Sequence, residues 1–186
     1  PLDRYIIQST GDSSLVPMNW QDRNYFHGKL LIKPTKHINL NYNSILDIHN
    51  WQEYNHSYAY NPYGDITRHN RSFTNSLTMT HMLSTKTFYQ AILSTYTRNY
   101  QHYVYKDPLD NRYTHYLLLQ QAPNVTPSFL TGGTNPEHFY RTTRNYLAKV
   151  DITSQLNRTN QIKLGIEYGR YQLDYKYWKV IQEDNS

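Results

Sequence analysis

Polar and apolar residues alternate along most of this chain with the period of two that is typical of β-strands. From Ile38 to Asn50 the even positions are mostly apolar, including Leu40, Leu46 and Ile48, while the odd positions are nearly all polar. Other segments repeat this alternation, namely 26–33, 72–81, 146–157 and 161–168. Residues 88–105 alternate less clearly, and we favour Tyr89, Ala91 and Leu93 as their apolar side. The pattern therefore predicts about six amphipathic strands and almost no helix.

The connections between these segments also alternate, between short and long. Three are short and polar, at 34–37, 84–87 and 158–160, and each is expected to join two strands as a hairpin. Three are long and rich in Gly, Pro, Asn and Tyr, at about 10–23, 55–66 and 106–144. One unit of strand, short turn, strand and long loop thus recurs, which predicts a single all-β domain over 1–186. Its expected fold is an antiparallel up-and-down meander, with Arg4–Gln8 as a possible seventh strand.

The length of the strands favours a membrane over a soluble core. Soluble strands usually have about 5 or 6 residues, whereas a strand that crosses hydrocarbon at a tilt needs about 9–11. Short turns at one end and long loops at the other are typical of outer-membrane barrels. Eight side chains on the apolar sides are predicted to face lipid: Leu40, Leu46, Ile48, Val150, Ile152, Ile162, Leu164 and Ile166. Because small barrels have at least eight strands, we expect this chain to be part of a larger transmembrane β-barrel.

Aromatic residues near the strand ends suit the girdles that border the apolar belt of such barrels. This interpretation covers Trp51, Tyr54, Tyr168, Tyr175, Tyr177 and Trp178. The chain has 20 tyrosines and only 18% charged residues, a composition that argues against disorder. Its net charge of +5 comes from scattered Lys and Arg without a basic stripe, so we expect no nucleic-acid partner.

Three parts of the chain carry a hairpin sequence that can be compared with known barrels: His81–Tyr89 with Ser94–Tyr96, Phe139–Arg141 with Lys149–Asn157, and Gln161–Tyr168. They resemble barrel hairpins of TonB-dependent outer-membrane receptors, in the branch that carries a carboxypeptidase-like regulatory domain. The resemblance implies a 22-stranded barrel with a globular plug, which imports an iron chelate, cobalamin or a glycan with energy relayed by TonB. It implies outer-membrane lipid, the rest of the barrel and the plug as partners, with TonB acting only through a missing N-terminal part.

Candidate sites for chemistry are few. The nine histidines lack metal-ligand spacing, and Asp107–Asn111 is either a loop calcium site or a proline-containing turn. We find no nucleophile elbow and no paired carboxylates, so we expect no enzyme activity, cofactor or metal. Tyrosines of the second long loop are candidates for stacking on a ligand or for packing against neighbouring loops: Tyr54, Tyr58, Tyr60 and Tyr63.

Two other classes of protein remain open. One is a soluble or surface-displayed β-sheet module that binds carbohydrate, which would need a second layer to cover its apolar side. The other is a barrel that does not use TonB, such as a porin or an adhesin, which would lack the plug.

Overall fold

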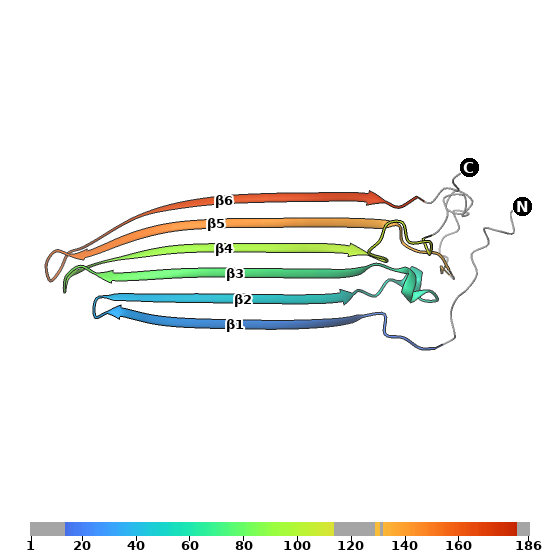
Figure 1. Ribbon diagram of the computed structural model, residues 1–186, viewed down its shortest axis with the longest axis horizontal. Helices are drawn as coiled ribbons and strands as arrows, with labels where there is room; N and C mark the ends of the chain where they lie inside the picture. Colours follow the sequence, from blue (N-terminus) through green and yellow to red (C-terminus); the bar gives the residue numbers. More distant parts are fainter. Residues whose placement is uncertain (1–13, 114–128, 131, 182–186) are drawn as a thin grey trace, which may run out of the picture.

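Six long antiparallel strands form one continuous sheet in the computed structural model, which describes residues 14–113, 129–130 and 132–181. The strands follow one another in chain order across the sheet, as Figure 1 shows. Their bounds are β1 (Trp20–Thr35), β2 (Ile38–Gln52), β3 (Thr67–Met82), β4 (Thr87–Tyr103), β5 (Glu137–Gln155) and β6 (Gln161–Lys179). The predicted all-β meander of about six strands is confirmed, while Arg4–Gln8 lies outside the described residues.

The short and long connections lie at opposite ends of the sheet (Figure 1). We call these the turn end and the loop end. At the turn end, the side chain of Ser84 accepts hydrogen bonds from two backbone N–H groups of its turn, and Asn157 does the same in the β5–β6 turn. These side chains satisfy backbone donors where the strand pairing stops, which explains why short polar turns suffice here.

Two of the loop bounds expected from the sequence were wrong. β1 begins at Trp20, inside the expected loop 10–23, and β5 begins at Glu137, well before residue 144. The reason is that the first part of each strand carries polar or aromatic side chains on both sides. Alternation therefore gives no signal there, although the backbone pairing continues, for example between His138 and Trp178.

The register places the apolar sides of all six strands on one face of the sheet. Even positions of β1 pair with even positions of β2, and these pair with odd positions of β3. Odd positions of β3 pair with odd positions of β4, which pair with even positions of β5, and these pair with even positions of β6. We call this the apolar face and its opposite the polar face. Leu93 pairs with Leu77 and Ala148, so the favoured apolar side of β4 agrees with the register.

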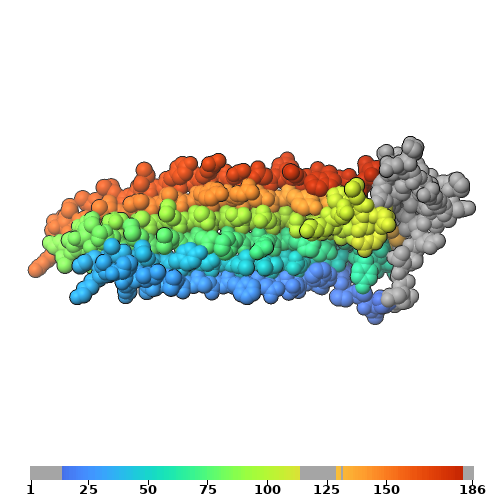
Figure 2. All heavy atoms as spheres, in the orientation of Figure 1, coloured from blue at the N-terminus to red at the C-terminus, as the bar shows by residue number. Residues whose placement is uncertain are grey.

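The described residues contain no second layer that covers this sheet. Beside the strands they form only two short 3₁₀ helices, η2 (His56–Tyr58) and η3 (Pro62–Gly64), both at the loop end. No described helix has the length and apolar character needed to cross a membrane. The space-filling view shows an elongated slab made of strands, with the segment after β4 lying over the strand ends (Figure 2). Most large apolar side chains of the strands are consequently exposed.

Candidate functional site

The eight side chains predicted to face lipid all lie on the apolar face. They belong to a band of apolar side chains, which we call the apolar band, that crosses all six strands. Many of its members are exposed; Ile166 has 75% of its surface accessible and Leu164 has 65%. From the turn end up to the top of the band, the apolar-face positions carry no Asp, Glu, Lys or Arg. Such a surface has the character of a region in contact with hydrocarbon.

Aromatic rings mark the top of the apolar band, on the side of the loop end. The uppermost apolar side chain is aromatic on four of the six strands: Phe26, Phe73, Tyr146 and Tyr168. On three of these strands the next position on the same face is an arginine: Arg71, Arg144 and Arg170. An aromatic ring followed by a cation matches the order of a lipid interface, where rings lie at head-group level and cations meet phosphate.

Three of the expected girdle residues were wrong. Trp51, Tyr175 and Tyr177 occupy odd positions of β2 and β6 and so lie on the polar face. Trp178 lies on the apolar face, but its ring stacks on His138 and Tyr140 above the apolar band. Tyr168 alone of the strand residues in that set borders the band. Strand ends are therefore not enough to identify a girdle, because the face of each residue must also be known.

The apolar band runs obliquely across the hydrogen-bonded rows of the sheet. The hydrogen-bonded row through Phe26, the top of the band in β1, reaches Gln172 in β6. The top of the band in β6 is Tyr168, which is four residues nearer the turn end (172 minus 168). The lower limit of the band, at the turn end, shifts in the same way. The row through Ile32, the lowest member of the band in β1, reaches Ile166 in β6, and the band in β6 continues four residues further to Ile162. With about 3.3 Å per residue and about 4.8 Å between strands, this shift corresponds to a tilt of roughly 30°.

The polar face has the opposite character. It carries amides, hydroxyls and ion pairs, such as Arg23 with Asp47 at 2.7 Å and Lys149 with Asp151 at 3.3 Å. The side-chain oxygen of Asn41 is buried and lacks a hydrogen-bond partner among the described residues. A wet environment would supply that partner, so this face suits water or a polar filling.

At the loop end, two connections far apart in the sequence are joined. The backbone N–H of Leu130 donates to the carbonyl of Ser57 at 2.7 Å, and that of Asn135 donates to the carbonyl of Gly64 at 2.8 Å. Gly133 has a φ of 84°, a left-handed conformation that favours glycine. Its carbonyl accepts from the side chain of Asn61 at 2.7 Å and lies where a Cβ on Gly64 would clash. These contacts hold the β2–β3 loop against the end of the β4–β5 connection.

The four candidate tyrosines have different surroundings in this assembly. Tyr58 is only 9% exposed, and burial raises its pKa to about 12 with smaller contributions from Asp65 and Glu137. Tyr54 donates or accepts a hydrogen bond with His56 at 2.7 Å, and the ring of Tyr60 packs edge-on against Phe129. Tyr54, Tyr60 and Tyr63 remain more than half exposed. Tyr58 therefore packs the loop, while the other three are open to a ligand.

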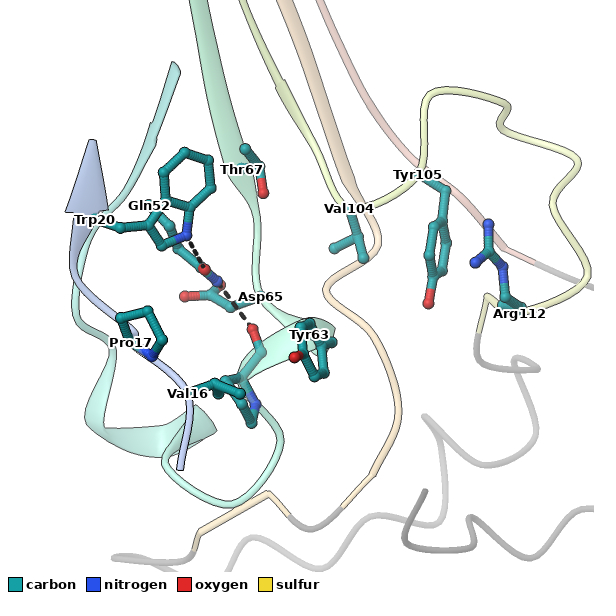
Figure 3. Close-up of a pocket in the computed structure, with 11 residues that line it drawn as sticks. Val16, Pro17, Trp20, Gln52, Tyr63, Asp65, Thr67, Val104, Tyr105 and Arg112 are labelled. Carbon is teal, nitrogen blue, oxygen red and sulfur yellow. Dashed lines mark hydrogen bonds between the residues drawn. The ribbon is translucent and has the colours of Figure 1, made fainter. Parts of the chain in front are cut away.

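Tyr63 lines a pocket of about 610 Å³ at the loop end of β1 to β3 (Figure 3). Trp20 donates through its indole N–H to Gln52, which in turn donates to the carbonyl of Pro62, so one wall is fixed by hydrogen bonds. On the other side, the Arg112 guanidinium lies 3.8 Å from the centre of the Tyr105 ring. The pocket combines aromatic walls with polar groups and could hold a small polar ligand.

A buried cluster anchors the β4–β5 connection beside this pocket. His138 is fully buried and lies 2.7 Å from the hydroxyl of Tyr113, while the backbone N–H of Tyr105 donates to that same hydroxyl. Burial raises the pKa of Tyr113. These contacts indicate that His138 and Tyr113 stabilise the packing of the loop end.

The possible calcium site at Asp107–Asn111 is a turn stabilised by its own side chains. Asp107 accepts from the backbone N–H of Leu109, and both guanidinium contacts of Arg112 reach Asp110 at 2.8 and 2.7 Å. The Arg112 hydrogen bonds lower the pKa of Asp110 to about 2. Across the described parts of the chain, no three His, Cys, Asp or Glu side chains gather closely enough to hold a metal ion.

No protein family, no curated protein and no solved structure matches this chain.

Proposed function

We propose that this chain is a section of the wall of a TonB-dependent receptor in the bacterial outer membrane. In this role the apolar face contacts lipid, the polar face lines the lumen, and the loop end faces the outside of the cell. The observation that carries the proposal is the apolar band, which keeps one uncharged surface across six strands and is bordered by aromatic rings and arginines. Its tilt of roughly 30° is close to the strand tilt of about 35–45° in such barrels.

The physical reason is the absence of hydrogen-bonding partners in hydrocarbon. A membrane-spanning sheet must bond all of its backbone groups internally, which only a closed barrel does. The open edges of β1 and β6 would then be paired by neighbouring strands of the same barrel. Lipid favours apolar side chains on the outside, and a wet lumen favours the amides and ion pairs of the polar face. The step from a barrel to a TonB-dependent receptor rests on the resemblance of the hairpin sequences alone.

In this proposal the loop-end assembly would meet the nutrient. Tyr54, Tyr60 and Tyr63 are exposed there, and the Tyr63 pocket lies beside them. The binding step would need no catalytic group in this chain. A soluble carbohydrate-binding module is less favoured, because it would need a layer over the apolar band, and the described residues provide none.

The first test places a charge on each face of β2. In the full-length gene product that contains this chain, Leu46→Arg puts a cation in the apolar band and Asn43→Arg puts one on the polar face. A lipid-facing Arg costs about 2–4 kcal/mol at the middle of the bilayer and less toward its surfaces. Leu46 lies between the middle and the top of the apolar band, since only Ile48 is above it in β2. We expect Leu46→Arg to reduce the folded protein in the outer-membrane fraction severalfold and Asn43→Arg to leave it unchanged. Equal recovery of both variants would contradict the assignment of the faces.

A second measurement separates the receptor from other barrels. Uptake of the nutrient, once found by growth on candidate nutrients, should stop in a host that lacks TonB while the protein remains in the outer membrane. Uptake that continues without TonB would favour a porin and would leave the membrane assignment intact.

A further inference from the structure

The upper part of the polar face carries a run of aromatic rings from strand to strand. Trp51 of β2 lies 5.9 Å from the ring of Tyr100 in β4, which lies 5.8 Å from Phe139 in β5. Phe139 in turn stacks on Tyr175 of β6 at 6.4 Å. These positions are above the level where the apolar band ends on the other face. The run is therefore too high for a lipid girdle and lies on the wrong face for one.

Two arginines lie among these rings without an acidic partner in the part of the chain that the structure describes. Arg141 pairs with Tyr100 across the β4–β5 ladder, and its guanidinium lies 5.4 Å from the Tyr100 ring. Arg98 pairs with Thr143 in the same ladder, so the two arginines are diagonal neighbours on one face. Side chains in that relation are about 7–8 Å apart at their Cα atoms, within reach of two long side chains.

The lack of a described carboxylate within 4.0 Å distinguishes these two arginines from their neighbours on the same face. Arg23 is paired with Asp47, and Arg68 lies 3.3 Å from Glu53. Arg98 instead donates to the amide oxygen of Asn70, and no described carboxylate lies within 4.0 Å of Arg98 or Arg141. Two like charges on neighbouring strands of one face repel each other, and an anion between them would reduce that repulsion.

We propose that Arg98 and Arg141, with the rings of Tyr100 and Phe139, form a binding site for a small organic anion that carries a planar ring. The guanidinium groups would bind its carboxylate or phenolate oxygens, and the aromatic side chains would stack on its ring. This site rests on the proposed function, because it lies in the outer vestibule of the lumen only if the polar face lines a barrel. There it would capture the ligand before transport.

Two features favour an organic anion over a lipid phosphate. The site lies on the face opposite the apolar band, so a lipid whose tails contact that band would not reach it. The rings also offer stacking area, which a lone inorganic phosphate would not use.

The test uses phthalate, whose two carboxylates on one ring match two adjacent arginines, with the full-length gene product folded in detergent micelles. Binding is followed by ligand-observed NMR. Phthalamide has the same ring without charge, and succinate has two carboxylates without a ring. We expect phthalate to bind about tenfold more tightly than phthalamide, which lacks the charged oxygens. It should also bind about tenfold more tightly than succinate, which has no ring to stack on the aromatic side chains.

Matched variants test the residues. Arg98→Gln and Arg141→Gln should each weaken phthalate binding about tenfold, and Arg144→Gln should change it less than twofold. Arg144 is the control because it is on the same strand as Arg141 but on the apolar face, where it is paired with Asp174. Circular dichroism of each variant verifies that it has folded. Equal binding of phthalamide, or an equal loss in Arg144→Gln, would overturn the site.

The outcome is separable from that of the proposed function. Arginine-dependent phthalate binding by a protein that is not found in the outer membrane would support the anion site and contradict the proposed receptor function. If the protein is in the outer membrane and takes up its nutrient with the help of TonB, but does not bind phthalate through Arg98, the receptor function is supported and the anion site is contradicted.

Discussion

At the scale of single residues, Tyr58 couples the packing of the loop end to pH. Burial of its ring is the main reason that its pKa is raised to about 12, because the charged phenolate is poorly solvated there. An unfolded tyrosine titrates near pH 10. The folded pKa is higher than the unfolded one, so the stability contributed by neutral Tyr58 is complete below about pH 10 and is lost as the pH rises through about 12.

We therefore expect the loop end to loosen between about pH 10 and 12, and Tyr58→Phe to reduce this alkaline loss, since Phe keeps the ring and cannot ionise. Near-ultraviolet circular dichroism of the folded protein would follow the change. Tyr60→Phe serves as the control, because Tyr60 is 64% exposed. If both variants loosen over the same pH range as the unmodified protein, Tyr58 is not the titrating group.

The same residue shows which part of the candidate site could be predicted from the sequence. The cluster of tyrosines in a long loop was visible, but the sequence could not separate the buried Tyr58 from the exposed Tyr63. That difference depends on segments near residue 130, which lie more than 60 residues away in the chain and contact the loop through backbone groups such as those of Leu130 and Ser57. Backbone contacts of this kind leave no residue pattern to read.

At the scale of the elements, the apolar band runs obliquely across the hydrogen-bonded rows. If the apolar face contacts lipid as proposed, residues of one row therefore lie at different depths in the membrane. Ile32 and Ile166 share a row, yet Ile32 is at the lower limit of the band in β1, whereas Ile166 is in the middle of the band in β6. The cost of a lipid-facing Arg falls from about 2–4 kcal/mol at the middle of the bilayer to about 0–1 near its surfaces.

Ile166→Arg should therefore destabilise the folded protein by roughly 2 kcal/mol more than Ile32→Arg. Urea unfolding in lipid vesicles would measure the two free energies. If the strands crossed the membrane without tilt, the two positions would have the same depth and the two costs would be alike. That result would contradict the oblique placement of the sheet while leaving the lipid-facing assignment untouched.

The strands themselves were the most predictable elements, and for a physical reason. Where one face is apolar and the other polar, as from Ile38 to Ile48, the period of two is visible in the sequence and fixes the facing of each residue. The starts of β1 and β5 lie above the apolar band, where both faces carry polar or aromatic groups, and alternation vanishes there. The register between strands, which turns six separate patterns into one band, required the structure.

At the scale of the whole molecule, the sheet has two faces of opposite character and two unpaired edges. The apolar face ends in arginines toward the loop end, and the polar face carries rings and arginines at the same end. One sheet could thus meet lipid on one side and a soluble ligand on the other. This division of roles needs a closed wall, since an open sheet would let water and lipid reach both faces around β1 and β6.

Hydrogen exchange at the two edge strands tests for that closed wall. About half of the backbone N–H groups of β6 point away from β5, as in any edge strand, and those of β1 point away from β2 in the same way. In hydrocarbon, an unbonded N–H costs several kcal/mol, so neighbouring strands should occupy both edges.

We expect these outward N–H groups to be as strongly protected in the full-length protein in vesicles as those of the central strands β3 and β4. In the isolated 186-residue chain in detergent, they should exchange at least tenfold faster than the central strands, because detergent micelles admit water to an open edge. Rapid exchange at β1 and β6 in the full-length protein as well would mean that the sheet stays open, and the barrel would then be abandoned in favour of a sheet module that works outside the bilayer.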